Sequence, residues 1–169
     1  MKLFSLSVAA ILALSFQSAS AETQTIAYPS TEAASFVIVA PEDWELEPAE
    51  EEGQFFDLTG PTGAVFSFRT IEGSEDALKE AIDESFVEIA ERFDNVEMGE
   101  AQAWTPNGLE GFYATGTGKD KEDGTARRIG VGWAILKDNR LAEFWFVGEA
   151  TDQEGLSAAE AIANSMQAP

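Results

Sequence analysis

Cysteine and histidine are absent from the 169-residue sequence. Without cysteine the chain has no disulfide, no thiol nucleophile and no site for a lipid attached through cysteine. Without histidine it lacks the usual general base of serine and cysteine enzymes, and the two absences together remove the common ligands of zinc. Several classes of enzyme and metalloprotein are therefore excluded before any motif is considered.

Basic residues are scarce as well. Ten Lys and Arg residues stand against 31 Asp and Glu residues, which gives a net charge of −21. Nucleic acid is not an expected partner, because neutralising its phosphates needs clustered basic groups. Hydrophobic residues make up 44% of the chain, with 12 Phe and 4 Trp, so the sequence predicts a folded core rather than a disordered acidic tail. A chain of this length is expected to form one domain.

The first 21 residues differ from the rest. Lys2 is followed by an apolar stretch from Leu3 to Phe16, and the segment ends in Ala19-Ser20-Ala21. This pattern is typical of a secretory signal peptide that is cleaved after Ala21. The apolar stretch is shorter than the roughly 20 residues that span a bilayer. We expect a mature periplasmic or secreted protein with a net charge of −22, because Lys2 is the only charged residue removed.

Residues 22–35 are polar and rich in small residues, which predicts a flexible leader before a single domain at 36–169. The stretch Glu42–Glu52 has seven acids in eleven residues and predicts a loop. In the segment Ala64–Ile71, Phe66 and Phe68 alternate with polar residues, so one side is expected to be buried and the other wet. The predicted strands are Phe36–Val39, Phe55–Leu58, Ala64–Ile71, Val96–Trp104, Leu109–Thr117, Arg127–Leu136 and Leu141–Val147.

Two segments have helical periodicity. The first, Glu75–Phe93, follows Ser74 as N-cap and is expected to form the ion pairs Glu75–Lys79 and Glu88–Arg92. The second, Ser157–Met166, begins with Ser157 and Glu160 at the spacing of a capping box. The apolar stripe predicted for the first helix consists of Leu78, Ala81, Ile82, Phe86, Ile89 and Phe93.

The order of these elements predicts an α+β fold. Strands mostly follow strands, which is typical of an antiparallel sheet rather than of alternating βαβ units. We expect a twisted antiparallel sheet of about six or seven strands, with a long helix after the third strand and a C-terminal helix packed on it.

A resemblance to a known family rests on the same order. Its features are the short strand leading into Pro41-Glu42-Asp43-Trp44, the Phe-rich strand pair, the helix after Ser74, the Gly-containing strand Leu109–Gly118, the Trp hairpin and the final helix ending near Ser165. In these features residues Ser35–Gln167 resemble the PsbP/DcrB-type domain. The resemblance implies an α-β-α sandwich that serves as a binding or assembly-accessory module, without a shared catalytic constellation. The chain lacks the His and Cys used for metal contacts and lipidation in some members.

Catalytic and metal-binding motifs are weak. No serine lies in a nucleophile motif, and no glycine-rich loop has the spacing of a nucleotide site. A pair of carboxylates across a cleft could hydrolyse an envelope polymer, but among 31 acids the sequence does not select a pair. The acidic stretch Asp120–Gly124 resembles a calcium loop only loosely. No cofactor is expected, and the protein is more readily interpreted as a non-enzyme, with the hydrolase and the calcium-binding domain as alternatives.

Four of the few basic residues cluster in one stretch. Lys119, Lys121, Arg127 and Arg128 are candidates for contact with an anionic ligand or partner, since a local positive charge steers association in so acidic a chain. The sequence favours the alternative, in which they pair with neighbouring carboxylates. The glycines Gly111, Gly116, Gly130 and Gly132 either line a ligand pocket, or mark bulges or let a helix approach the sheet.

Together these patterns predict a non-enzymatic exported binding or assembly-accessory protein. We expect it to be a monomer that binds an unidentified protein or small molecule.

Overall fold

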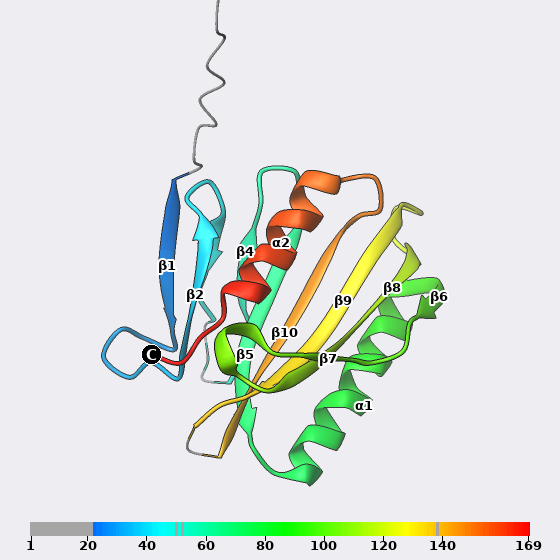
Figure 1. The fold of residues 1–169 in the computed structure, drawn as a ribbon. Helices are drawn as coiled ribbons and strands as arrows, with labels where there is room; N and C mark the ends of the chain where they lie inside the picture. Colours follow the sequence, from blue (N-terminus) through cyan, green and yellow to red (C-terminus); the bar gives the residue numbers. More distant parts are fainter. Residues whose placement is uncertain (1–21, 50, 52, 138) are drawn as a thin grey trace, which may run out of the picture.

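The computed structural model describes residues 22–49, 51, 53–137 and 139–169. The predicted signal peptide, residues 1–21, lies outside the described residues. None of the helices described is long and apolar enough to cross a membrane. Figure 1 shows the elements. They are β1 (Thr23–Tyr28), β2 (Phe36–Pro41), β3 (Glu45–Glu47), β4 (Phe56–Thr59), β5 (Val65–Glu72), α1 (Glu75–Arg92), β6 (Phe93–Met98), β7 (Gln102–Trp104), the 3-10 helix η1 (Pro106–Gly108), β8 (Gly111–Asp120), β9 (Ala126–Ile135), β10 (Arg140–Glu149) and α2 (Gln153–Ser165).

The main sheet has eight strands in the described part of the chain. Its order is β3-β4-β5-β10-β9-β8-β6, with β7 also paired to β8, and every pairing is antiparallel. The predicted α+β class and antiparallel sheet are confirmed. Two gains and one loss separate this sheet from the seven predicted strands. Val96–Trp104 divides between β6 and β7, and the acidic stretch contains the edge strand β3, whereas the predicted strand Phe36–Val39 is β2 of a separate sheet. All three residues of β3 are exposed, so the sequence shows no alternation of apolar and polar residues that would predict this strand.

A second, two-stranded sheet is formed by β1 and β2. The register runs from Thr23 opposite Pro41 to Tyr28 opposite Phe36. Ile26 and Tyr28 are buried, which ties β1 to the core. The predicted flexible leader therefore contains a strand, which the sequence did not show because only these two large apolar side chains alternate in it.

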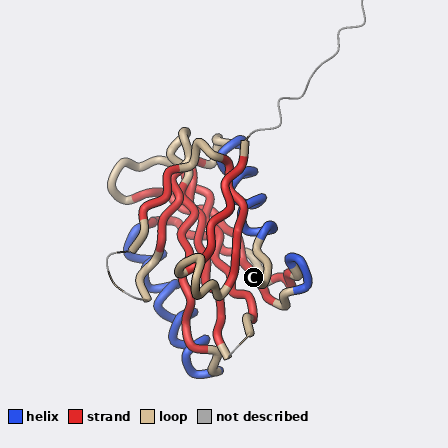
Figure 2. The backbone as a smooth tube through the Cα atoms, turned by 90° about the vertical axis from the view of Figure 1, so that its left-hand side faces the viewer, coloured by secondary structure: helices blue, strands red, loops and turns tan. Residues whose placement is uncertain are grey.

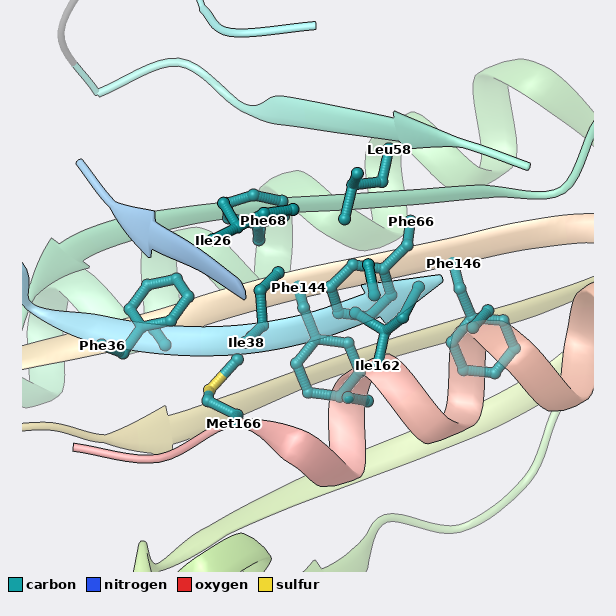
Figure 3. Close-up of a cluster of buried hydrophobic side chains, with 14 of the residues drawn as sticks. Ile26, Phe36, Ile38, Leu58, Phe66, Phe68, Phe144, Phe146, Ile162 and Met166 are labelled. Carbon is teal, nitrogen blue, oxygen red and sulfur yellow. The ribbon is translucent and has the colours of Figure 1, made fainter. Parts of the chain in front are cut away.

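The core has two parts, one on each face of the main sheet. On one face, Phe66 and Phe144 pack against β2 and α2, and Figure 3 shows these rings facing Ile162 and Met166. On the other face, Trp133 packs with residues of α1. In Figure 2 the helices lie on either side of the strands. The arrangement is the expected α-β-α sandwich, with the β1-β2 pair added to the α2 layer.

Helix α1 begins as predicted but turns a different side to the sheet. The Ser74 hydroxyl accepts a hydrogen bond from the Ala77 amide at 3.1 Å, which confirms the N-cap. Ser85 is buried, whereas Phe86 is 46% exposed, so the predicted apolar stripe is wrong at Phe86. The physical reason is the hydrogen bond that Ser85 makes with a buried carboxylate of the sheet, described below.

The charges and the second helix require three further corrections. Lys79 pairs with Asp83 at 3.0 Å and not with Glu75, whereas the Glu88–Arg92 pair is present at 3.3 Å. Arg69, expected in water, has a side chain only 21% exposed because α1 covers that face.

The N-cap of α2 is Asp152, which accepts from the Gly155 amide at 2.9 Å, so the capping box predicted at Ser157 is wrong. The hydrogen bonds from Thr62 and Gly155 hold the pKa of Asp152 below its usual range.

Candidate functional site

A pocket of about 240 Å³ lies between α2 and the face of the main sheet that α2 covers. Helix α2 packs against β2, β5 and β10, and in Figure 1 it lies over β10 with β9 and β8 to one side. The pocket is lined on this side by Tyr113 and Thr115 of β8 and by Arg128 of β9, and we call it the α2 pocket. Its aromatic floor on the strands is formed by Trp104, Tyr113, Phe144 and Phe146, and α2 adds the apolar side chains of Leu156 and Ala163. Its polar lining consists of Thr115, Arg128, Gln153, Ser157, Glu160 and Asn164.

Two glycines of β9 shape the floor. A Cβ added at Gly130 would overlap the Phe146 ring, and one at Gly132 would lie 2.5 Å from Cζ of Phe144. The rings can therefore lie across β9 only because these positions lack side chains. Gly130 and Gly132 thus admit aromatic rings of β10 rather than a helix or a bulge, and this packing places the aromatic floor of the pocket.

The other two glycines, Gly111 and Gly116, serve neighbouring strands. A Cβ at Gly111 would overlap the Trp133 carbonyl oxygen, and one at Gly116 would lie 2.5 Å from the carbonyl oxygen of Glu97. They allow close approach of strands rather than lining the α2 pocket.

The β7-η1 segment fixes one end of the pocket. The indole N–H of Trp104 donates to Asn164 Oδ1 at 2.9 Å. Asn107, whose φ of 45° is left-handed, donates from Nδ2 to the carbonyl oxygens of Asn164 and Met166. These bonds hold the C-terminal end of α2 against the segment. The sequence offered no sign of this contact, because Trp104 and Asn164 lie 60 residues apart.

The four basic candidates do not form one patch. Arg127 and Arg128 are neighbours on β9 and therefore point to opposite faces of the sheet. Arg127 lies 3.3 Å from Asp120 and 2.7 Å from Asp123, as the carboxylate alternative predicts. Arg128 lines the α2 pocket and has no carboxylate within ion-pair distance in the described part of the chain.

The two lysines lie elsewhere. Lys121 is 3.9 Å from Asp94 and donates to the Ala90 carbonyl oxygen at 2.6 Å, which attaches it to the end of α1. Lys119 is exposed on β8 and lines none of the described pockets. Only Arg128 of the four therefore contributes to the α2 pocket.

The acidic candidates are engaged in local structure. Asp123 accepts a hydrogen bond from the Thr125 amide at 2.7 Å, and this bond together with Arg127 holds the pKa of Asp123 below its usual range. Among the residues that the structure describes, no three acidic side chains converge in a way that could hold a metal ion. Glu160 is the only carboxylate among the lining residues of the α2 pocket. Glycoside hydrolysis requires two carboxyl groups, so this pocket does not support that chemistry.

A buried charge network lies on the opposite face. Glu143 is fully buried, with Oε2 at 2.6 Å from Arg69 Nε, and Ser85 donates to its Oε1 at 3.2 Å. Burial raises the pKa of Glu143, and the Arg69 guanidinium partly offsets this. The network joins α1 to β5 and β10. We interpret it as structural, because it is enclosed on the α1 side, away from the α2 pocket.

No protein-family model matches the sequence, and no curated protein matches it. Solved structures do share its fold. The cyanobacterial PsbP (CyanoP) of Synechocystis sp. PCC 6803 matches with a TM-score of 0.61 and 11% identity, over 94% of this chain and 99% of the other. LpqN of Mycobacterium tuberculosis, which is involved in cell envelope biogenesis, matches with a TM-score of 0.59 and 11% identity, over 88% and 91%.

A third structure extends the comparison to a eukaryote. The Ran-binding protein Mog1p of Saccharomyces cerevisiae matches with a TM-score of 0.54 and 14% identity, over 88% of this chain and 96% of the other. At such identities the likeness concerns the fold. The chain has the PsbP-like fold, and the resemblance found in the order of its predicted elements is confirmed at that level.

Proposed function

We propose that the protein is a non-enzymatic, exported binding or assembly-accessory protein that holds its ligand or partner in the α2 pocket. One observation carries the proposal: a preformed concave site combines an aromatic floor with a small set of polar side chains. Ligand sites in proteins have this composition, because apolar surface supplies affinity and a few polar groups fix orientation.

The structural neighbours support the class of function but not its details. Mog1p is a Ran-binding protein and LpqN is involved in cell envelope biogenesis, so one protein with this fold acts through binding and another serves the envelope. A fold alone does not determine a function, and the neighbours therefore name no ligand for this chain.

Export and domain organisation are part of the proposal. The apolar stretch and the Ala19-Ser20-Ala21 site support cleavage of residues 1–21. The mature protein then begins at Glu22, directly before β1. We propose a monomeric single domain in the periplasm or outside the cell, with β1 as part of the folded unit.

Blocking the pocket is expected to abolish binding. Ser157 is exposed on α2 and lines the pocket, so Ser157→Trp places an indole in its mouth. Ala161 is exposed on the same helix but does not line the pocket, so Ala161→Trp is the matched control. Each protein is isolated without denaturation from the cells that make it and is examined by native mass spectrometry for bound small molecules and by in-cell crosslinking for partners.

We expect the Ser157→Trp variant to lose at least about tenfold in occupancy, equivalent to about 1.4 kcal/mol, and the Ala161→Trp variant to match the wild type. Equal occupancy in all three proteins would contradict the assignment of the pocket. Turnover of an envelope polymer by the purified protein would contradict the non-enzymatic proposal.

A further inference from the structure

We infer that the α2 pocket selects a small amphipathic anion, an apolar organic molecule with a carboxylate or sulfonate group that pairs with Arg128. This inference rests on the binding function proposed above, and it adds the chemical class of the ligand. It is carried by the unpaired charge of Arg128, by its position beside the aromatic floor, and by the size of the pocket.

Arg128 has neither an ion pair nor a side-chain hydrogen bond among the described residues. Five of the described basic residues lie within 4.0 Å of a carboxylate, including Arg127, the immediate neighbour of Arg128. Lys119, Lys137 and Arg140 also form no ion pair there, but Arg140 donates to the Thr70 hydroxyl, so Arg128 is the one described arginine with no side-chain partner. A guanidinium offers five N–H donors in a planar fork that matches a carboxylate. Within the described residues, an incoming anion therefore meets no carboxylate that already pairs with Arg128.

The neighbours of Arg128 provide the apolar half of the site. Arg128 stands on β9 opposite Thr117 of β8 and Gly148 of β10, on the same side of the sheet as Tyr113 and Phe146. The side chain of Phe146 is nine-tenths buried or more and lies in the floor. A ligand can thus place an anionic group on Arg128 and an apolar group over the aromatic rings.

The pocket has room for a small organic molecule. Its volume is about 240 Å³, and sites of about 300–1,000 Å³ hold drug-sized ligands, so we propose a compact ring system as the apolar part of the ligand.

Glu160 lies on α2 in the wall of the same pocket. It forms no ion pair with Arg128 among the described residues. Its negative charge opposes an anion in the pocket. Removal of this charge should therefore strengthen anion binding, whereas a merely apolar site would not respond.

Two fluorescent probes test the inference with the wild-type mature protein. The anion 8-anilinonaphthalene-1-sulfonate and the neutral N-phenyl-1-naphthylamine have the same rings and differ by the sulfonate group. Charge-assisted hydrogen bonds are the stronger kind, so we expect the anionic probe to bind about tenfold more tightly than the neutral one. Arg128→Gln should remove this preference. Arg127→Gln removes the same charge from the other face and should preserve it, and Glu160→Gln should increase it several-fold.

Each variant is first checked for an unchanged thermal unfolding transition. If both probes bind equally to the wild type and Ser157→Trp abolishes both, the α2 pocket remains a binding site but the inference about an anion is overturned. The inference is also overturned if Arg127→Gln weakens the anionic probe as much as Arg128→Gln does. If Ser157→Trp changes neither probe, the proposed pocket itself is contradicted.

Discussion

Replacement of Arg69 by methionine is expected to lower the free energy of unfolding by about 3 kcal/mol, because removing one partner of a buried ion pair leaves the other charge uncompensated. Glu143 is that other partner. It is fully buried and lies 2.6 Å from Arg69 Nε, while Ser85 supplies only one neutral hydrogen bond. Arg69 also lies 4.4 Å above the Phe55 ring, so its loss removes a cation–π contact as well.

Urea-induced unfolding at neutral pH measures this effect. Arg92→Met is the matched control: Arg92 pairs with Glu88 on the surface of α1, where its side chain is 54% exposed, and such pairs contribute about 0–1 kcal/mol. The double variant Arg69→Met with Glu143→Leu should recover most of the loss, because apolar side chains can replace a buried ion pair. If Arg69→Met lowers the free energy of unfolding no more than Arg92→Met does, the network does not stabilise the packing of α1.

The loss caused by Arg69→Met should depend on pH. Burial raises the pKa of Glu143 in the folded state, and the pKa should rise further once Arg69 is gone. Between the unfolded and the folded pKa the folded state binds more protons, so stability falls as the pH rises through that window. The difference between variant and wild type should therefore be smaller near about pH 5 than near about pH 8.

Truncation of Phe144 to alanine is expected to cost about 3–5 kcal/mol, the usual range for a buried Phe→Ala substitution. Phe144 is 2% exposed, stacks on Phe66 with ring centroids 5.7 Å apart and lies 5.0 Å from the Trp104 ring. Its loss opens a cavity between Gly132 and α2. The substitution also removes part of the pocket floor, so binding in the α2 pocket should weaken together with stability.

The matched control is Phe86→Ala on α1. Because Phe86 is 46% exposed, its truncation should change the free energy of unfolding by about 0.5 kcal/mol or less. Denaturant unfolding of both variants tests whether Phe86 is exposed, as in the structure, or buried, as the apolar stripe predicted for α1 implies. Similar losses in the two variants would contradict the described orientation of α1.

The sequence was informative wherever local chemistry determines structure. The Ser74 cap, the strands around Phe66 and Phe144, and the β9-β10 hairpin all follow from short patterns. The sequence did not predict the features that depend on residues far apart in the chain. Strand β3 is held by pairing with β4. Ser85 is buried because it donates a hydrogen bond to Glu143, which lies 58 residues away in the sequence. The true cap of α2 was missed because Ser157 matched the motif better than Asp152.

The candidate site was only partly predictable. The basic stretch directed attention to Arg128, and strand alternation separates it from Arg127. Which of the two faces the α2 pocket becomes clear only from the packing of α2 on the sheet. The aromatic floor depends on two glycines of β9 that lie beneath rings of β10. The other polar lining residues, apart from Thr115 and Arg128, come from α2, and no local pattern indicates which strands that helix leaves uncovered.

The most direct test of the proposed function is an amide chemical-shift titration of the isotopically labelled mature protein with 8-anilinonaphthalene-1-sulfonate. The α2 pocket predicts saturable shifts that are largest at Thr115, Arg128, Ser157 and Glu160, from three separate elements that meet only there. The outer side of α1, which includes Glu80 and Glu84, should remain unchanged. Shifts that are largest on α1, or that show no saturation at the α2 pocket, would contradict the account.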